Sequence, residues 1–394
     1  MHVGNSPFSK THRRCRQTKW EQGQSSTGQP QKKVESGVRA GDLCRIRCRR
    51  NSQQRLRGKF PVSVSIDEEE IYASWIGQAF AIGVNGGFVM LLQEEGIILS
   101  LFEGWKYYRW YLRQTPSVKD KQIETWNGQW ICHALSDDFN EDRPFDGFSV
   151  DVTEVQGKMA IPTKEWSRVI FALTKQYKGT ITAYAYNLSQ TNTTFGFINI
   201  YLPEIEELYE LKDKLFLDKS AVILTRKQIS ELETFYNFRS ACKMGAIGLK
   251  ALEPRGLREF MPKGSVDFAQ SKDFKFSDDN SFQTFQLYQI WIMAMLNKTE
   301  LLQLASEVAK TLIDLELNQS DREKSKTIQK RTSKEVMESK NVRDFIDGLT
   351  EIIHVNNAEA FKNVVEQVLK MPFDNFPLFS TLIRFEYFYQ KAKN

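Results

Sequence analysis

The sequence predicts an α+β protein, in which a mixed α/β body precedes a C-terminal helical bundle and a disordered basic tail forms the N-terminus. Residues 1–60 combine fifteen Lys and Arg with three acids and few apolar residues, too few to offset the entropy of ordering. Strand-like and helical patterns then mix up to about residue 270, and helical periodicity continues from Ser281. We therefore expect a tail at 1–58, a body at 59–270 and a bundle at 281–394.

The first part of the body contains short segments of both kinds. Alternation and composition predict these elements, in order: a strand at Val62–Ile66, a helix at Ile71–Phe80, and a hairpin of Gly87–Leu92 and Ile97–Phe102 around an acidic Glu94–Gly96 turn. The glycine cluster Gly83–Gly87 lacks the strand-to-helix context of a phosphate-binding loop, so we interpret it as a hairpin turn. Residues 126–160 are rich in turn signals.

The second part of the body and the bundle have longer elements. Enrichment in β-branched and aromatic residues predicts two strands, Thr180–Leu188 and Thr194–Leu202. Capping signals and periodicity predict body helices at Thr163–Gln176, Glu204–Phe216 and Arg226–Phe235. The bundle follows, with helices starting at Ser281 and at Thr299–Leu317, a charged linker at Asn318–Met337, and helices at Val342–Ile353, Ala358–Leu369 and Leu378–Lys391.

The distribution of charge and the number of cysteines indicate which cellular compartment and which kinds of partner to expect. The net charge of +5 combines +12 in residues 1–60 with about −7 in the remaining 334 residues, so a basic head precedes a slightly acidic body. Five cysteines, an odd number, favour a reducing compartment. No secretory signal is visible, and acids and glycines interrupt the apolar stretch Ala79–Phe102. We expect a cytoplasmic protein without a membrane partner, although an Arg-rich, acid-poor N-terminus is also typical of organellar transit peptides.

Signatures of catalysis are scarce. The sequence contains no phosphate-binding loop, zinc-protease helix or nucleophile elbow. His12, Cys15, Cys44 and Cys48 have loose spacing for a zinc site, and we interpret them as residues of the tail. Acidic pairs beginning at Asp137 and Asp278 leave a metal-dependent nuclease as an alternative. The sequence thus predicts a chain that is not an enzyme and has no cofactor and no metal.

Three groups of basic residues are candidates for nucleic-acid contact. The run Trp105–Arg113 interleaves aromatic rings with cations, which suits base stacking beside phosphates; a buried helix with a core of aromatics is the alternative. A second group surrounds the glycine-rich Met244–Gly248, and a third lies in the charged linker. For each of these two groups, the alternative is an ordinary solvated surface. The predicted nucleic-acid-binding residues are Arg109, Arg239, Lys243, Lys250, Arg255, Arg258, Lys326, Lys330 and Arg331.

Four segments resemble the large subunit of type I CRISPR effector complexes (Cascade), in the variant of myxobacteria and cyanobacteria. They are Ile161–Leu173, the strand-to-helix passage Phe197–Leu208, the small-residue segment Ser240–Leu249, and Lys340–Leu349 with the helices that follow it. The resemblance covers roughly residues 160–390. The first sixty residues match nothing in the family and the N-terminal portion is shorter than usual, so the resemblance assigns no recognition of a target-adjacent motif.

The resemblance implies a non-catalytic subunit that works beside guide RNA, target DNA and the other subunits of an antiviral interference complex. The complex would recruit a separate helicase-nuclease or transposition proteins. Guide pairing would read the sequence while the protein contacts backbone and shape. The alternatives are a protein-interaction or scaffolding subunit of another assembly, such as an organellar one, and a nuclease with a degenerate site.

Overall fold

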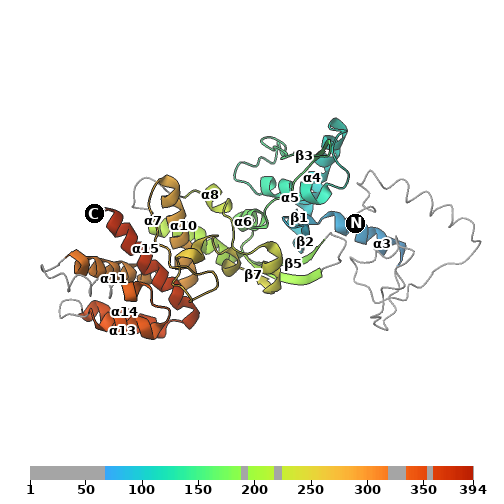
Figure 1. Cartoon of the computed structure of the whole chain (residues 1–394). Coiled ribbons are helices and arrows are strands. Elements are labelled where there is room, and N and C mark those ends of the chain that lie inside the picture. Colours follow the sequence, from blue (N-terminus) through green and yellow to red (C-terminus); the bar gives the residue numbers. More distant parts are fainter. Residues whose placement is uncertain (1–66, 188–193, 217–223, 318–333, 353–357, 394) are drawn as a thin grey trace, which may run out of the picture. The chain divides into compact units, whose positions relative to one another are not determined.

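The computed structural model describes residues 67–187, 194–216, 224–317, 334–352 and 358–393 (Figure 1). These residues form an α+β protein with a mixed sheet and a C-terminal group of helices, as predicted. They divide into two compact units: unit 1 holds the described residues of 67–202 together with 237–247, and unit 2 holds those of 203–236 and 248–393. The predicted tail at 1–58 and the predicted strand Val62–Ile66 lie outside the described residues.

The division into units differs from the predicted boundary between body and bundle. Residues 203–236 and 248–270, which belong to the predicted body, cluster with the C-terminal helices. One reason is the indole of Trp291 in the C-terminal group, whose Nε1 donates to the carbonyl oxygen of Leu249 at 3.0 Å. The predicted bundle therefore packs together with part of the predicted body.

The described strands of unit 1 form a five-stranded sheet in the order β1-β2-β5-β6-β7. Its first four strands pair antiparallel, and β7 runs parallel to β6. The bounds are β1 (Ile82–Val84), β2 (Phe88–Leu92), β5 (Thr180–Asn187), β6 (Thr194–Tyr201) and β7 (Ala246–Ile247). Gly86 and Gly87 adopt φ values of +89° and +75° between β1 and β2, which confirms the glycine cluster as a hairpin turn.

The two faces of β5 and β6 differ sharply. Ile181, Ala183 and Ala185 of β5 alternate with partly exposed residues, and Ile198 and Ile200 of β6 are buried opposite them. Helices α6 (Trp166–Gln176) and α9 (Phe238–Lys243) cover this buried face, because the ring of Phe238 lies 5.9 Å from that of Phe88 and 6.2 Å from that of Trp166. The strands predicted at Thr180–Leu188 and Thr194–Leu202 are confirmed.

Three more helices complete unit 1: α3 (Glu68–Ala79), α4 (Glu95–Gln114) and α5 (Ile123–Ala134), with a separate hairpin of β3 (Thr153–Val155) and β4 (Lys158–Ala160). The strand predicted at Ile97–Phe102 is wrong, since this segment begins α4. Its buried residues Ile97 and Leu101 continue with Trp105 and Tyr108 at helical spacing, a pattern that six residues alone cannot distinguish from a strand. Asn127-Gly128, one of the turn signals in residues 126–160, forms no turn, because both residues lie within α5.

Unit 2 is built around α15 (Phe376–Lys393), in which every residue from Phe376 to Tyr387 is buried. It packs against α10 (Asp279–Leu296) and α11 (Glu300–Leu317). The other elements are α7 (Leu202–Phe216, beginning at the unit boundary), α8 (Arg226–Ser230), η2 (Leu249–Leu252), η3 (Leu257–Phe260), α13 (Val342–Thr350), α14 (Ala358–Lys370) and η4 (Phe373–Asn375). None of the described helices has the length and apolar character needed to span a bilayer.

Glycine 104 allows α4 and α5 to approach closely. A Cβ on Gly104 would lie 2.5 Å from Cδ1 of Trp130, inside van der Waals contact. The carbonyl oxygen of Gly104 also accepts a hydrogen bond from Nε1 of Trp126 at 3.1 Å. The missing side chain thus brings two buried tryptophans of α5 against α4.

We predict that Gly104→Ala destabilises the protein by about 2 kcal/mol or more, because Trp130 is fully buried and must shift. The matched control is Gly77→Ala in α3, where a Cβ meets nothing within 4 Å. That change should leave stability unaltered or raise it by up to about 1 kcal/mol through helix propensity. Urea unfolding of both variants measures the difference, and equal stabilities would contradict the packing described.

The carboxyl group of Glu124 is buried in the first turn of α5. Burial raises its pKa to about 7 from an ordinary value of 4.5. A raised pKa in the folded state means that folding favours the protonated form. The stabilising effect is complete below about pH 4.5 and is lost as the pH rises through about 7.

We predict that the free energy of unfolding falls by up to about 3 kcal/mol between pH 4.5 and pH 7.5 because of Glu124. Glu124→Gln keeps the shape of the side chain and removes the titration, so this variant should lose that part of the decline. Urea unfolding at a series of pH values provides the measurement. An identical pH dependence in the two proteins would show that Glu124 titrates near its ordinary value.

Candidate nucleic-acid interface

Helix α4 has a buried face and an exposed face. The sequence offered two interpretations of the run Trp105–Arg113, a buried aromatic core and a nucleic-acid contact, and each interpretation fits one of these faces. Trp105 and Tyr108 are buried, as in the interpretation of a helix with an aromatic core. Arg109 lies on the solvent side, where exposed residues recur at three- and four-residue spacing along the helix. We call this surface the α4 outer face; it comprises Phe102, Lys106, Arg109, Trp110 and Arg113.

Two of the three cations on the α4 outer face have no ion-pair partner among the described residues. Lys106 forms an exposed ion pair with Glu103 at 2.9 Å, while Arg109 and Arg113 make no ion pair within the described parts of the chain. The indole of Trp110 is 50% exposed, and its edge-to-face contact with Phe145, 5.4 Å between centroids, orients it. A half-exposed ring between two arginines suits a base that stacks while its phosphates meet the guanidinium groups.

Sequence reasoning named the run Trp105–Arg113 as a candidate and Arg109 as its predicted binding residue, but it missed Phe102. The signal was present, because positions 102, 106, 109, 110 and 113 share one side of a helix. The wrong strand at Ile97–Phe102 concealed the place of Phe102, because it assigned this residue to a strand and not to the helix that follows.

Arg239 and Lys243 lie together on α9 in unit 1, exposed and without an ion pair among the described residues. The Asn237 side chain accepts a hydrogen bond from the Ser240 amide at 2.8 Å and caps the helix. Phe238 and Cys242 anchor its buried side. Gly245, at φ +77°, then turns the chain into β7. These two cations therefore stand beside the edge strand of the sheet.

The other residues of the second basic group, Lys250, Arg255 and Arg258, belong to unit 2. Arg258 forms a bidentate ion pair with Glu253, with distances of 2.7 and 2.8 Å and side-chain exposures of 15% and 5%. It also donates to the hydroxyl of Tyr236 at 2.9 Å and lies 4.0 Å from the ring centroid of Phe235. The hydrogen bonds to Glu253 raise the pKa of Arg258, and they leave its guanidinium engaged within the fold.

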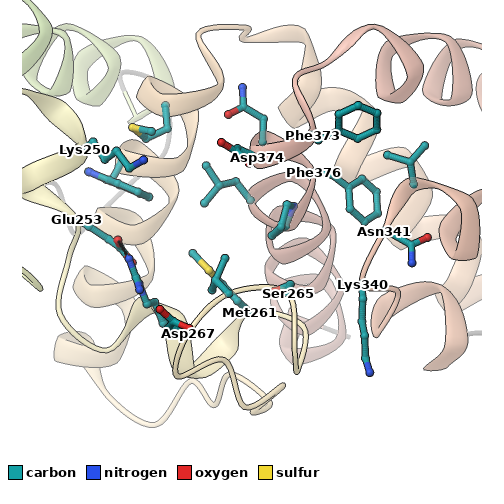
Figure 2. Close-up of a pocket in the computed structure, with 18 of the residues that line it drawn as sticks. Lys250, Glu253, Met261, Ser265, Asp267, Lys340, Asn341, Phe373, Asp374 and Phe376 are labelled. Atoms are coloured by element: carbon teal, nitrogen blue, oxygen red, sulfur yellow. Dashed lines mark hydrogen bonds and ion pairs between the residues drawn. The ribbon is translucent and has the colours of Figure 1, made fainter. Parts of the chain in front are cut away.

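Lys250 and the Arg258–Glu253 pair also line a pocket of ≈ 660 Å³ in unit 2 (Figure 2). Lys340 is a further lysine of its lining, while Asp267 and Asp374 contribute carboxylates, so the formal charges around the pocket balance. The other labelled lining residues are Met261, Ser265, Asn341, Phe373 and Phe376. A balanced lining gives a polyanion little electrostatic advantage here.

Arg255 pairs with Glu233 at 2.9 Å on the exposed surface, so its charge is partly offset. The predicted residues Lys326, Lys330 and Arg331 lie outside the described residues, as do the cysteines and histidine of the loose zinc pattern. The structure therefore brings Arg109, Arg239 and Lys243 into one unit as exposed cations, and places Lys250, Arg255 and Arg258 in the other.

Asp137 and Asp278, the acidic residues considered for a metal-dependent nuclease site, both make contacts that stabilise the fold. Asp137 pairs with Lys175 at 2.9 Å, and Asp278 caps α10 by accepting a hydrogen bond from the Ser281 amide at 2.7 Å. Within the described residues, no group of three or more His, Cys, Asp or Glu is placed to hold a metal ion. Burial raises the pKa of the Cys132 thiol to about 11 and that of Cys242 to about 12, so both are protonated at neutral pH.

Comparison with known proteins identifies no relative of this chain. No family model, no curated protein and no solved structure matches this chain. The segments that carry the CRISPR resemblance fold into elements of both units. Ile161–Leu173 leads into α6, Phe197–Leu208 passes from β6 into α7, Ser240–Leu249 contains β7, and Lys340–Leu349 enters α13.

We predict that Arg258→Ala destabilises the protein by about 3 kcal/mol, because it leaves the carboxylate of Glu253 buried without its partner. The control is Lys250→Ala, an exposed residue of the same pocket, which should change stability by less than about 0.5 kcal/mol. Urea unfolding measures both. An Arg258→Ala variant as stable as the control would mean that Arg258 is free to serve a ligand.

Proposed function

We propose that this chain is a non-catalytic nucleic-acid-binding subunit and that the α4 outer face is a principal contact surface. The observation that carries the proposal is the exposed Trp110 between Arg109 and Arg113, neither of which has an ion-pair partner among the described residues. Arginine satisfies phosphate oxygens with several donors, and tryptophan offers a large face for stacking. The buried side of the same helix holds this arrangement in place.

The assembly we propose is an RNA-guided CRISPR interference complex acting in antiviral defence in the cytoplasm. The support is the resemblance of four segments to the large subunit of type I effector complexes. In such a complex the chain would hold guide RNA or target DNA beside other subunits, and a separate helicase-nuclease or transposition proteins would act on the target. Guide pairing supplies sequence specificity, so the protein needs contacts to backbone and exposed bases only.

A second candidate is a protein-interaction or scaffolding subunit. Phe373, 85% exposed, and Leu369 support it, since large exposed apolar side chains are enriched where proteins associate. Salt dependence separates the two candidates. Binding through phosphates weakens steeply as salt rises, whereas apolar association does not.

We predict that the double variant Arg109→Ala/Arg113→Ala binds single-stranded nucleic acid more weakly and with a flatter salt dependence. Two lost phosphate contacts should reduce the slope of log K against log salt by about 1.4. Trp110→Ala should weaken binding by roughly tenfold without changing the slope, because it removes stacking and no charge. Fluorescence anisotropy titrations of the full chain at several salt concentrations supply both quantities.

The control for this experiment is Arg343→Ala, which removes an arginine whose side chain is 90% exposed on α13 in unit 2. It should bind as the unaltered protein does. The proposal fails if the full chain shows no salt-dependent affinity for RNA or DNA. It also fails if the control and the double variant lose the same affinity, since the effect would then be general charge.

A further inference from the structure

The pocket of unit 2 has an apolar interior. Its lining includes three buried side chains from different elements: Met261, which follows η3, Trp291 of α10 and Leu378 of α15. The volume of ≈ 660 Å³ lies within the range of pockets that enclose ligands. Methionine is flexible and adapts its shape to what it contacts. The pocket can therefore enclose a bulky apolar side chain.

An exposed aromatic side chain stands at the edge of the same pocket. Phe373 belongs to the lining and is 85% exposed, although it is a large apolar residue. It begins η4, and the amide of Asn375 donates a hydrogen bond to the carbonyl oxygen of Pro372 at 2.9 Å, which closes the turn. Phe376, directly after the turn, is buried and anchors it. Because the turn already holds Phe373 at the surface, little conformational entropy is lost when its ring is bound.

Four exposed charged residues of the lining have no ion-pair partner among the described residues. We call them the pocket rim; they are Lys250, Asp267, Lys340 and Asp374. In Figure 2 they follow one another around the pocket in the order Lys250, Asp374, Lys340, Asp267, so the two signs alternate. A nucleic acid would be repelled by two of these residues and attracted by the other two, so the pocket rim does not favour it.

The alternating charges of the pocket rim are complementary to themselves. A second copy of this surface can face the first across a two-fold axis that runs between a lysine and the neighbouring aspartate. Every lysine of one copy then meets an aspartate of the other copy, at all four positions of the pocket rim. A two-fold contact uses the same patch on both subunits, so that patch must hold both the inserted group and its receptor. Unit 2 carries Phe373 and the apolar pocket side by side.

We propose that the pocket, Phe373 and the pocket rim form the interface of a homodimer, in which the Phe373 ring of each copy enters the pocket of the other. An aromatic anchor in an apolar pocket, surrounded by a polar rim, is the arrangement that dominates the energy of many protein interfaces. Pairs between the two rims set the orientation of the copies. The proposal goes beyond the nucleic-acid contact of α4 and does not depend on it, because α4 belongs to unit 1.

The test is sedimentation equilibrium of the full chain at concentrations from about 1 to 100 µM. We expect the unaltered chain to dimerise within this range. Phe373→Ala should raise the Kd of the dimer roughly thirtyfold or more, as the loss of a central anchor does. The matched control is Phe197→Ala, which removes a similarly exposed aromatic side chain, 74% exposed, from unit 1 and should leave the Kd unchanged.

Charge reversal provides a second test that is specific to a contact between two copies. Lys250→Glu/Lys340→Glu makes the pocket rim wholly acidic, and Asp267→Lys/Asp374→Lys makes it wholly basic. Each variant alone should remain monomeric where the unaltered chain is a dimer, because like charges face each other. An equimolar mixture of the two variants should form dimers again, since acidic and basic rims then meet. The four residues are exposed, and circular dichroism melting verifies that each variant folds.

Three results would overturn the proposal. The first is an unaltered chain that stays monomeric over the whole concentration range. The second is a dimer that persists undiminished in Phe373→Ala, because the copies would then meet through another surface. The third is a mixture of the two charge-reversed variants that stays monomeric although each variant is folded.

Discussion

A hydrogen-bonded set of tryptophans between α4 and α5 determines what unit 1 can present to solvent. The indole of Trp105 donates to Oδ1 of Asn127 at 3.0 Å, and that of Trp130 donates to the carbonyl of Ser100 at 2.8 Å. The amide of Asn127 in turn donates to the carbonyls of Ala79 and Ala81 at 2.7 and 2.9 Å. An unsatisfied buried indole or amide costs about 1–3 kcal/mol, so these bonds fix the rotation of α4 about its axis. That rotation decides which cations of the helix face water.

Whether a basic side chain is already paired within the fold decides whether it is a candidate for ligand contact. Its place in the sequence does not decide this. Arg109 and Arg258 look alike in the sequence, each within a stretch of aromatic and basic residues. Arg109 extends from an outer helical face, whereas Arg258 is held by Glu253 and the ring of Phe235. The same principle applies to the sheet, where α6 and α9 cover one face of β5 and β6, while Phe197 on the other face is 74% exposed.

The sequence predicts most of the longer elements, because their periodicity extends over many residues. The strands at β5 and β6 and the helices α10, α11, α14 and α15 agree with expectation. The segment Ile97–Phe102 failed because a short apolar run fits a strand and a helix equally well. The alternation of Tyr184 and Tyr186 with Ala183 and Ala185 was visible in the sequence, but it does not tell which face helices will cover. The pairing of Arg258 with Glu253, five residues away, depends on the fold of η3 and was equally hidden.

Crosslinking of the full chain to single-stranded RNA with ultraviolet light, followed by mass spectrometry of the crosslinked peptides, tests the central claim most directly. The account predicts crosslinks in α4 near Trp110, weakened by high salt. Crosslinks confined to residues 1–58, or to unit 2 alone, would contradict it, because the described surfaces of unit 1 would then have no part in binding.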